Sequence, residues 1–253
     1  MLTNVAQLAA TSKDIPTERN LTREMYAFLQ KLGYCRTHNA ILGPIVRECL
    51  LKGDLTAAVK EFKQLSQQYK HTPLQFELLS LLVRLCNGDE ELSKQYNCSA
   101  QDAQQLLSDI TEIITKIHGT VNMNSGLLLA FAESGSDNQL RRLLINPEFR
   151  INEELLLRNC EHLGQDGAVQ TLLRLARGAR GLNRVINEQN IYNMLLNNFI
   201  KTNNYEAALN LYERLDADDE LKVSQDFLRN IVQLLKANNI EIPSNIALRA
   251  HVV

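Results

Sequence analysis

The sequence contains no tryptophan, and only 11 glycines and 5 prolines occur among its 253 residues. Clusters of β-branched residues are rare whereas leucine is abundant, and this composition favours helix over sheet. Apolar residues make up 45% of the chain and charged residues 22%, which is ordinary for a globular protein with a sizeable core. The net charge of -2 excludes a global basic field that would attract nucleic acid.

Long hydrophobic runs are absent as well. No apolar run approaches the roughly 18 residues that a membrane span requires, so the sequence predicts no membrane segment. The N-terminus lacks the apolar core of a secretory signal, and Asp14 and Glu18 interrupt the acid-poor pattern of a transit peptide. We expect either a cytosolic protein or an internal piece of a longer chain whose targeting segment lies elsewhere.

Motifs for catalysis and metal binding are also missing. The five histidines form no H-E-x-x-H pattern, and the sequence holds no P-loop, no G-x-G-x-x-G and no G-x-S-x-G. The cysteines are odd in number and none pair at C-x-x-C spacing, which favours buried apolar side chains over zinc or redox chemistry. They are Cys35, Cys49, Cys86, Cys98 and Cys160. We predict a protein that is not an enzyme and has no cofactor or metal.

Two segments of the chain share the same spacing of apolar residues. The stretch "LKGDLTAAVKEFKQL" at 51–65 overlies "KTNNYEAALNLYERL" at 201–215 without a gap, at an offset of 150 residues. Apolar residues recur in both at steps of three and four, which is the spacing of one helix face. These residues are Leu55, Ala58, Phe62 and Leu65 in the first, and Tyr205, Ala208, Tyr212 and Leu215 in the second. Each stretch is therefore predicted to hold the turn and second helix of a helical hairpin.

Similar turns follow at a loose period. The turn residues are Gly53, Gly88, Gly135, Gly164 and Asn203. Glycine and asparagine tolerate the left-handed conformation that closes a helix. Two helices per period of about 35 residues is the signature of an all-α fold, an α-solenoid. We expect one array with approximate repeats at 1–37, 38–72, 73–118, 119–150, 151–186 and 187–222, and a C-terminal cap at 223–253.

Several local features qualify this pattern. Pro44 is expected to start or kink the first helix of its hairpin, because proline inside a helix costs about 3 kcal/mol. The polar stretch 90–98 is a loop insertion or a short irregular helix, and a strong helix follows over 99–117. Further helices are expected over 16–32 and 223–236, and residues 2–10 are expected to form the second helix of a truncated repeat.

The segment "NIYNMLLNNFIKTNNYEAALNLYERL" at 190–215 resembles a pentatricopeptide repeat. The matching residues are Tyr192, Asn193, Leu195, Leu196, Lys201, Ala208, Leu209, Leu211 and Tyr212, and Asn203 stands where that family's consensus has glycine. Tetratricopeptide repeats have a similar length, but their pattern begins with tryptophan, which this chain lacks.

The resemblance extends beyond one repeat. The stretches "NMLLNNFIKTNNYEAALNLYERLDADDELKVSQDFLRNIVQLLKANNIEIP" and "EELLLRNCEHLGQDGAVQTLLRL" are similar to the C-terminal region of leucine-rich pentatricopeptide proteins. This implies a mitochondrial matrix protein that binds RNA, stabilises mRNAs and supports their polyadenylation and translation. It also implies a small RNA-recognition-motif partner, no membrane, and a targeting peptide outside this chain.

Pentatricopeptide arrays read one base per repeat with side chains of the first helix. The resemblance places the reading role on Asn193, which follows the tyrosine of its first helix. Counting back ten from the other turn residues reaches Gly43, Leu78, Ser125 and Glu154. Gly43 and Leu78 have no side-chain group for a base edge, whereas Ser125 does. Asn193 and Ser125 are the candidate base contacts, and helix-surface amides or hydroxyls that meet only water are the alternative.

Arginines gather in one part of the chain. Residues 141–184 contain eight arginines and five acids, a local balance of +3. Arg174, Arg177, Arg180 and Arg184 step by three, three and four, so they form a basic ridge if the helix persists, or a basic loop if Gly178 and Gly181 break it. Either geometry suits phosphate oxygens, which match the guanidinium fork. A solvated helix face is the alternative.

Two functional hypotheses follow. The first is an RNA-binding module that holds phosphates through the arginines of 174–184. The second is a protein-interaction or capping segment with little RNA binding of its own, because most reading positions lack a suitable side chain.

Overall fold

The computed structural model describes residues 2–12, 16, 19–34, 37–160, 165–182, 185–217 and 223–250. Within these residues the chain forms helices and no strands, and this confirms the predicted all-α solenoid class. The helices are α1 (Leu2–Thr11), α2 (Leu21–Lys31), α3 (Asn39–Leu51), α4 (Leu55–Tyr69), α5 (Gln75–Cys86), α6 (Glu90–Tyr96), α7 (Ala100–His118), α8 (Thr120–Ser134), α9 (Asp137–Ile145), α10 (Glu153–Cys160), α11 (Gln165–Ala179), α12 (Glu188–Lys201), α13 (Tyr205–Asp216), α14 (Gln225–Ala237) and α15 (Ser244–Arg249).

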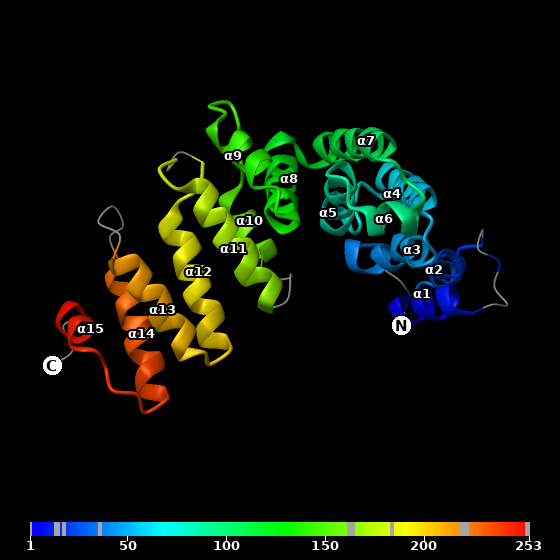
Figure 1. The fold of residues 1–253 in the computed structure, drawn as a ribbon. Coiled ribbons are helices and arrows are strands. Elements are labelled where there is room, and N and C mark those ends of the chain that lie inside the picture. Colours follow the sequence, from blue (N-terminus) through cyan, green and yellow to red (C-terminus); the bar gives the residue numbers. More distant parts are fainter. Residues whose placement is uncertain are drawn as a thin grey trace. The chain divides into compact units, whose positions relative to one another are not determined.

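The helices group into two compact units (Figure 1). The first unit comprises Met1–Ser136 with Arg150–Asn152, and the second comprises Asp137–Phe149 with Glu153–Val253. In the first unit α1 packs against α2 and α3, α3 packs against α4, and α5 packs against both α7 and α8. In the second unit α11 packs against α9 and α12, and α12 packs against α13 and α14. Each unit is thus built from antiparallel hairpins that cover one another's apolar faces.

The turn residues adopt the conformation that the sequence predicts. The φ angles are +76° at Gly53, +82° at Gly88, +76° at Gly135 and +53° at Asn203. Gly164 lies outside the described residues. The left-handed backbone at these positions ends one helix and reverses the chain, so it sets the length of each hairpin.

The two stretches that share a pattern are also capped alike. The Asp54 side chain accepts a hydrogen bond from the Ala57 amide at 2.7 Å, which begins α4. Asn204, which is 150 residues later, accepts one from the Ala207 amide at 3.0 Å and begins α13. Such a cap satisfies an amide that has no partner inside its helix and is typically worth about 1 kcal/mol.

Several predicted boundaries need correction. Helix α3 begins at Asn39 and contains Pro44, so the predicted start near Pro44 is wrong. The helix expected over 16–32 begins only at Leu21, where the Asn20 side chain caps it. Helix α1, which the sequence predicts as the second helix of a truncated repeat, packs on both α2 and α3. Of the two alternatives for residues 90–98, the short helix is observed as α6.

The core of the first unit joins α3, α4, α5 and α7. Phe62 of α4 belongs to this core and is fully buried. Its neighbours in the same cluster include Leu42, Ile45, Leu65, Leu78, Leu82, Ile110 and Ile114. At the edge of this core α8 approaches α5 closely, because a Cβ added at Gly126 would lie 3.1 Å from Leu79 Cδ1. Small residues at such contacts let helix backbones come near each other.

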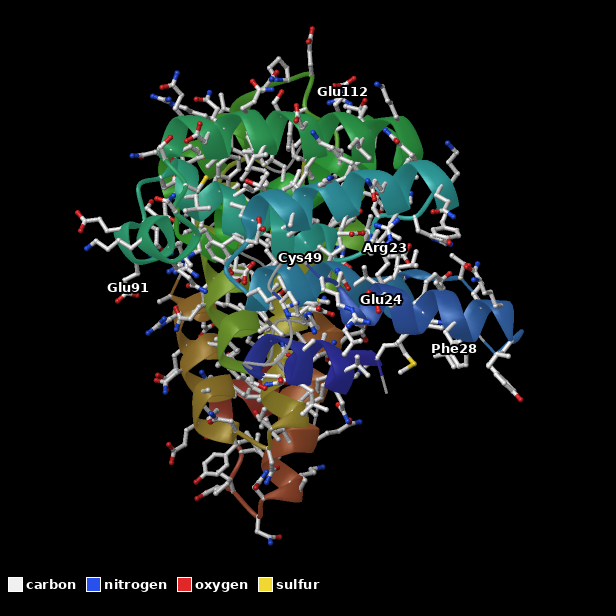
Figure 2. All side chains as sticks on the ribbon, turned by 90° about the vertical axis from the view of Figure 1, so that its right-hand side faces the viewer. Arg23, Glu24, Phe28, Cys49, Glu91 and Glu112 are labelled. Atoms are coloured by element: carbon white, nitrogen blue, oxygen red, sulfur yellow. The ribbon has the colours of Figure 1, made fainter. Side chains whose placement is uncertain are left out.

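Helix α2 is held to the rest of the first unit by charged side chains. Arg23 forms an ion pair with Glu61 of α4 and also donates to Gln64 at 2.7 Å. Figure 2 shows Arg23 on the side of α2 that faces the neighbouring helices, whereas Phe28 points away from them. Phe28 is 58% exposed.

A second anchor of α2 is the Glu48 carboxylate of α3, which is fully buried. It accepts hydrogen bonds from the backbone amides of Leu21 at 3.0 Å and Thr22 at 2.8 Å. It also accepts one from the Lys52 ammonium at 2.7 Å, and Lys52 donates in turn to the Arg19 carbonyl at 2.6 Å. Glu48 therefore supplies the first turn of α2 with a negative charge and two acceptors.

The Glu48 interactions make stability depend on pH. Burial raises the pKa of Glu48, but the hydrogen bonds from Lys52, Thr22 and Leu21 together outweigh it, so the pKa lies below the usual 4.5. A carboxyl with a lowered pKa in the folded state stabilises the fold above its unfolded pKa and loses that contribution as the pH falls. We expect the free energy of unfolding to fall below pH 4.5 more steeply than in Glu48→Gln, measured by urea denaturation at several pH values. Equal pH slopes in the two proteins would contradict this assignment.

Candidate nucleic-acid interface

The predicted base-reading positions of the first unit point into its core. Ser125 of α8 is fully buried, and its hydroxyl donates toward the carbonyls of Val121 at 3.0 Å and Asn152 at 3.2 Å. The same oxygen accepts a hydrogen bond from the Asn152 amide at 2.8 Å. Gly43 and Leu78 are buried as well. Ser125 is thus occupied in holding the segment after α9, and its burial places it away from any external RNA.

The corresponding positions of the second unit lie at the surface. Asn193 of α12 is half-buried and Glu154 of α10 is exposed. Asn190 and Asn197 are exposed and lie three and four residues from Asn193, so the three amides share one face of α12. Asn190 donates to the Glu153 carboxylate at 2.8 Å, which ties this face to α10. Asn197 is therefore an exposed amide of this face, whereas Asn193 is half-buried and Asn190 is held by Glu153.

Some of the arginines lie on a helix and one lies in a turn, so both predicted geometries occur. Helix α11 continues through Gly178 to Ala179, so Arg174 and Arg177 lie on a helix. Gly178 lets α11 approach α9 closely, because an added Cβ would lie 3.0 Å from Leu140 Cδ2 of α9. The helix then ends, and Gly181 has a φ of +72°, so Arg180 lies in a turn.

Their exposure differs. Arg177 and Arg180 are exposed and Arg174 is half-buried. Arg184 lies outside the described residues. The structure thus brings Arg174, Arg177 and Arg180 together on the last two turns of α11 and its end, a basic edge of the second unit.

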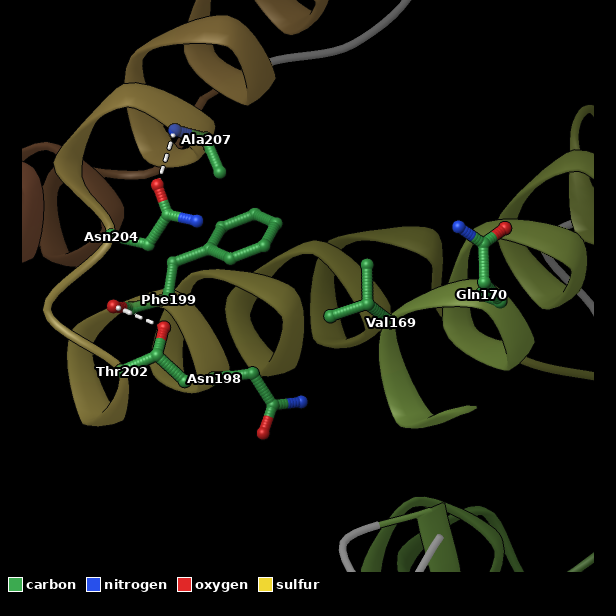
Figure 3. Close-up of a pocket in the computed structure, with 7 residues that line it drawn as sticks. All are labelled: Val169, Gln170, Asn198, Phe199, Thr202, Asn204 and Ala207. Carbon is green, nitrogen blue, oxygen red and sulfur yellow. Dashed lines mark hydrogen bonds between the residues drawn. The ribbon is translucent and has the colours of Figure 1, made fainter. Parts of the chain in front are cut away.

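Sequence reasoning missed a groove in the second unit, which Figure 3 shows. It has a volume of about 410 Å³ and lies where α11, the end of α12 and the start of α13 meet. The lining residues are Val169, Gln170, Asn198, Phe199, Thr202, Asn204 and Ala207. The turn residues at 203–204 indicated where the hairpin of α12 and α13 reverses. The space beside this turn is enclosed only because α11 packs against the hairpin, and the sequence does not reveal that contact.

The cysteines behave as buried apolar side chains where they are described. Cys49, Cys98 and Cys160 are buried and Cys86 is half-buried, whereas Cys35 lies outside the described residues. Burial, together with the nearby Glu61 carboxylate, raises the pKa of Cys49 to about 11, so its thiol stays protonated at neutral pH. No cluster of metal-binding side chains occurs among the described residues. None of the helices described has the length and apolar character needed to cross a membrane.

Stacked helical hairpins define a helical-repeat protein, a class whose surfaces suit extended ligands. The chain is similar to the leucine-rich PPR motif-containing protein, mitochondrial, of Rattus norvegicus and to the protein of the same name from Mus musculus. Each is 21% identical over 229 residues, which is 90% of this chain and 15% of the relative. The chain thus spans less than a sixth of the length of these relatives. No protein-family profile and no solved structure matches it.

Proposed function

We propose that this chain is a segment of a mitochondrial RNA-binding protein of the pentatricopeptide type and has no catalytic role. The supporting observation is the similarity to mitochondrial leucine-rich PPR proteins over 90% of the chain, in a fold of stacked helical hairpins. We place the segment near the C-terminus of the longer protein, in the mitochondrial matrix. The proposed activity is the stabilisation of mRNAs, with support for their polyadenylation and translation, together with a small RNA-recognition-motif partner.

Within this chain we assign RNA contact to the second unit. Arg174, Arg177 and Arg180 hold phosphates through bidentate guanidinium contacts, which position an RNA strand without reading its sequence. Asn193 on the accessible face of α12 contacts a base edge. The first unit contributes little, because its candidate reading positions are buried.

We expect Arg174→Ala, Arg177→Ala and Arg180→Ala together to weaken binding of a uniform single-stranded RNA at least about ten-fold, or about 1.4 kcal/mol. The slope of log affinity against log salt should fall by about 2, because each lost phosphate contact on a single strand removes about 0.7. The measurement is fluorescence anisotropy of the 253-residue chain with labelled RNA at several salt concentrations.

A matched control removes the same charge from the first unit by changing Lys60, Lys94 and Lys116 to alanine. All three side chains are exposed, and we expect a change of less than about two-fold. An equal loss in both variants would show attraction by net charge alone and contradict the assignment. An absence of RNA binding by the unaltered chain would favour the second hypothesis, a protein-interaction or capping segment. The burial of the candidate reading positions in the first unit is consistent with that hypothesis.

A further inference from the structure

The groove of the second unit combines an aromatic ring with amide groups. Figure 3 shows the Phe199 ring pointing from α12 into the space between Asn204 and Val169. The Asn204 oxygen is occupied by the Ala207 amide, and its amide nitrogen lies on the side of the Phe199 ring. Gln170 is exposed on α11 at the rim. Ligand sites are usually lined by apolar and aromatic side chains, with a few polar groups that fix the orientation of the ligand.

The rim of the groove continues into the arginines of α11. Gln170, Arg174 and Arg177 are spaced i, i+4 and i+7, so they form one stripe along the helix surface. At a rise of about 1.5 Å per residue, the backbone of Arg174 lies about 6 Å and that of Arg177 about 10 Å along the axis from Gln170. A ligand with a planar group in the groove and anionic groups beside it meets both features at once.

The other wall carries a matching charge. Arg214 of α13 is exposed and lies seven residues, or about two turns, beyond Ala207 on the same face. Glu206 and Glu213 are each next to one of these residues in sequence, which turns them about 100° around the helix and away from that face. The faces of α11 and α13 that border the groove thus carry arginines on both sides.

We infer that this groove holds an unstacked nucleobase of single-stranded RNA against the Phe199 ring, with the adjoining phosphates on Arg177 and Arg214. Base–aromatic stacking tolerates any base, and the amides of Asn204 and Gln170 add hydrogen bonds to a base edge. The charge on both walls favours a nucleic acid over an apolar peptide. The inference rests on the proposed RNA-binding function and adds a site where α11, the end of α12 and the start of α13 meet.

The first test is Phe199→Leu in the full 253-residue chain, assayed by anisotropy with a 12-nucleotide oligouridylate at several salt concentrations. Leucine keeps an apolar side chain but removes the stacking surface, so we expect affinity to fall about ten-fold. The salt slope should not change, because no phosphate contact is lost. Arg177→Ala should instead lower both the affinity and the salt slope, the latter by about 0.7.

The control for this test is Phe28→Leu in α2, which replaces an exposed phenylalanine of the first unit and should leave RNA affinity unchanged. A circular dichroism melt of each variant shows whether the helices remain folded. Unchanged affinity in Phe199→Leu, together with a loss of affinity in the arginine triple variant, would overturn the assignment of the groove as a base-binding site. The proposed RNA-binding function would still stand. An absence of RNA binding by the unaltered chain would overturn both.

A second test uses the absence of tryptophan from the chain. Phe199→Trp introduces a single indole at the groove, and a stacked base should quench its fluorescence with the same midpoint as the anisotropy titration. Phe28→Trp is the matched control and should show no quenching. RNA binding without quenching at position 199 would contradict base stacking there, and so would quenching by a peptide library but not by RNA.

Discussion

Replacing Glu48 by alanine is expected to lower the free energy of unfolding of the first unit by about 3–5 kcal/mol, the usual cost of removing one partner of a buried ion pair. The Lys52 side chain is only 6% exposed, so the substitution leaves its ammonium buried without a counter-charge. It also removes the acceptor of the Leu21 and Thr22 amides at the start of α2. Urea denaturation followed by circular dichroism measures the change.

The control for this prediction is Glu77→Ala, which breaks the ion pair with Arg47. Both side chains of that pair are at least 40% exposed, and exposed pairs contribute at most about 1 kcal/mol. Similar destabilisation in the two variants would mean that the burial of Glu48 does not decide its contribution.

Phe62→Ala is expected to cost about 3–5 kcal/mol as well, for a different reason. The ring is fully buried in the cluster that joins α3, α4, α5 and α7, so its removal leaves a cavity whose lining loses packing contacts. Hydrogen exchange of the unaltered chain and the variant measures the effect, which should appear as lost amide protection in those four helices.

Phe28→Ala is the matched control, because its ring is 58% exposed and its removal leaves no cavity. We expect a change within about 0.5 kcal/mol. If Phe62→Ala also stayed within this range, the packing of α4 against its neighbours would not be as the structure shows.

Much of the fold was predictable because the signals for helix starts and ends are local. Gly53, Gly88, Gly135 and Asn203 were found from the sequence, since few residues other than glycine and asparagine tolerate a left-handed backbone. Pro44 shows where a local rule is incomplete. Of the two alternatives, a start or a kink at the proline, the start is excluded, because α3 begins at Asn39 and its buried residues on both sides of Pro44 pack into the core.

The candidate site was less predictable. Counting ten residues back from a turn treats Ser125 and Asn193 as equivalent, but Ser125 is fully buried and Asn193 is only half-buried. The difference arises because the Ser125 hydroxyl serves as a partner for the backbone of Asn152, which no repeat pattern encodes. The groove at Phe199 was not predictable either, since its lining residues Val169 and Gln170 lie 30 and 29 residues earlier in the sequence.

The sequence by itself determined that the chain is all-α, where its hairpins reverse, and that its positive charge gathers in residues 141–184. These properties depend on backbone preference, helical spacing and composition, which act over a few residues. Only the tertiary structure decided which side chains remain at the surface, which charges are buried, as at Glu48, and where a groove opens between α11, α12 and α13. Those outcomes depend on contacts between helices far apart in the chain, and such contacts leave no periodic trace in the sequence.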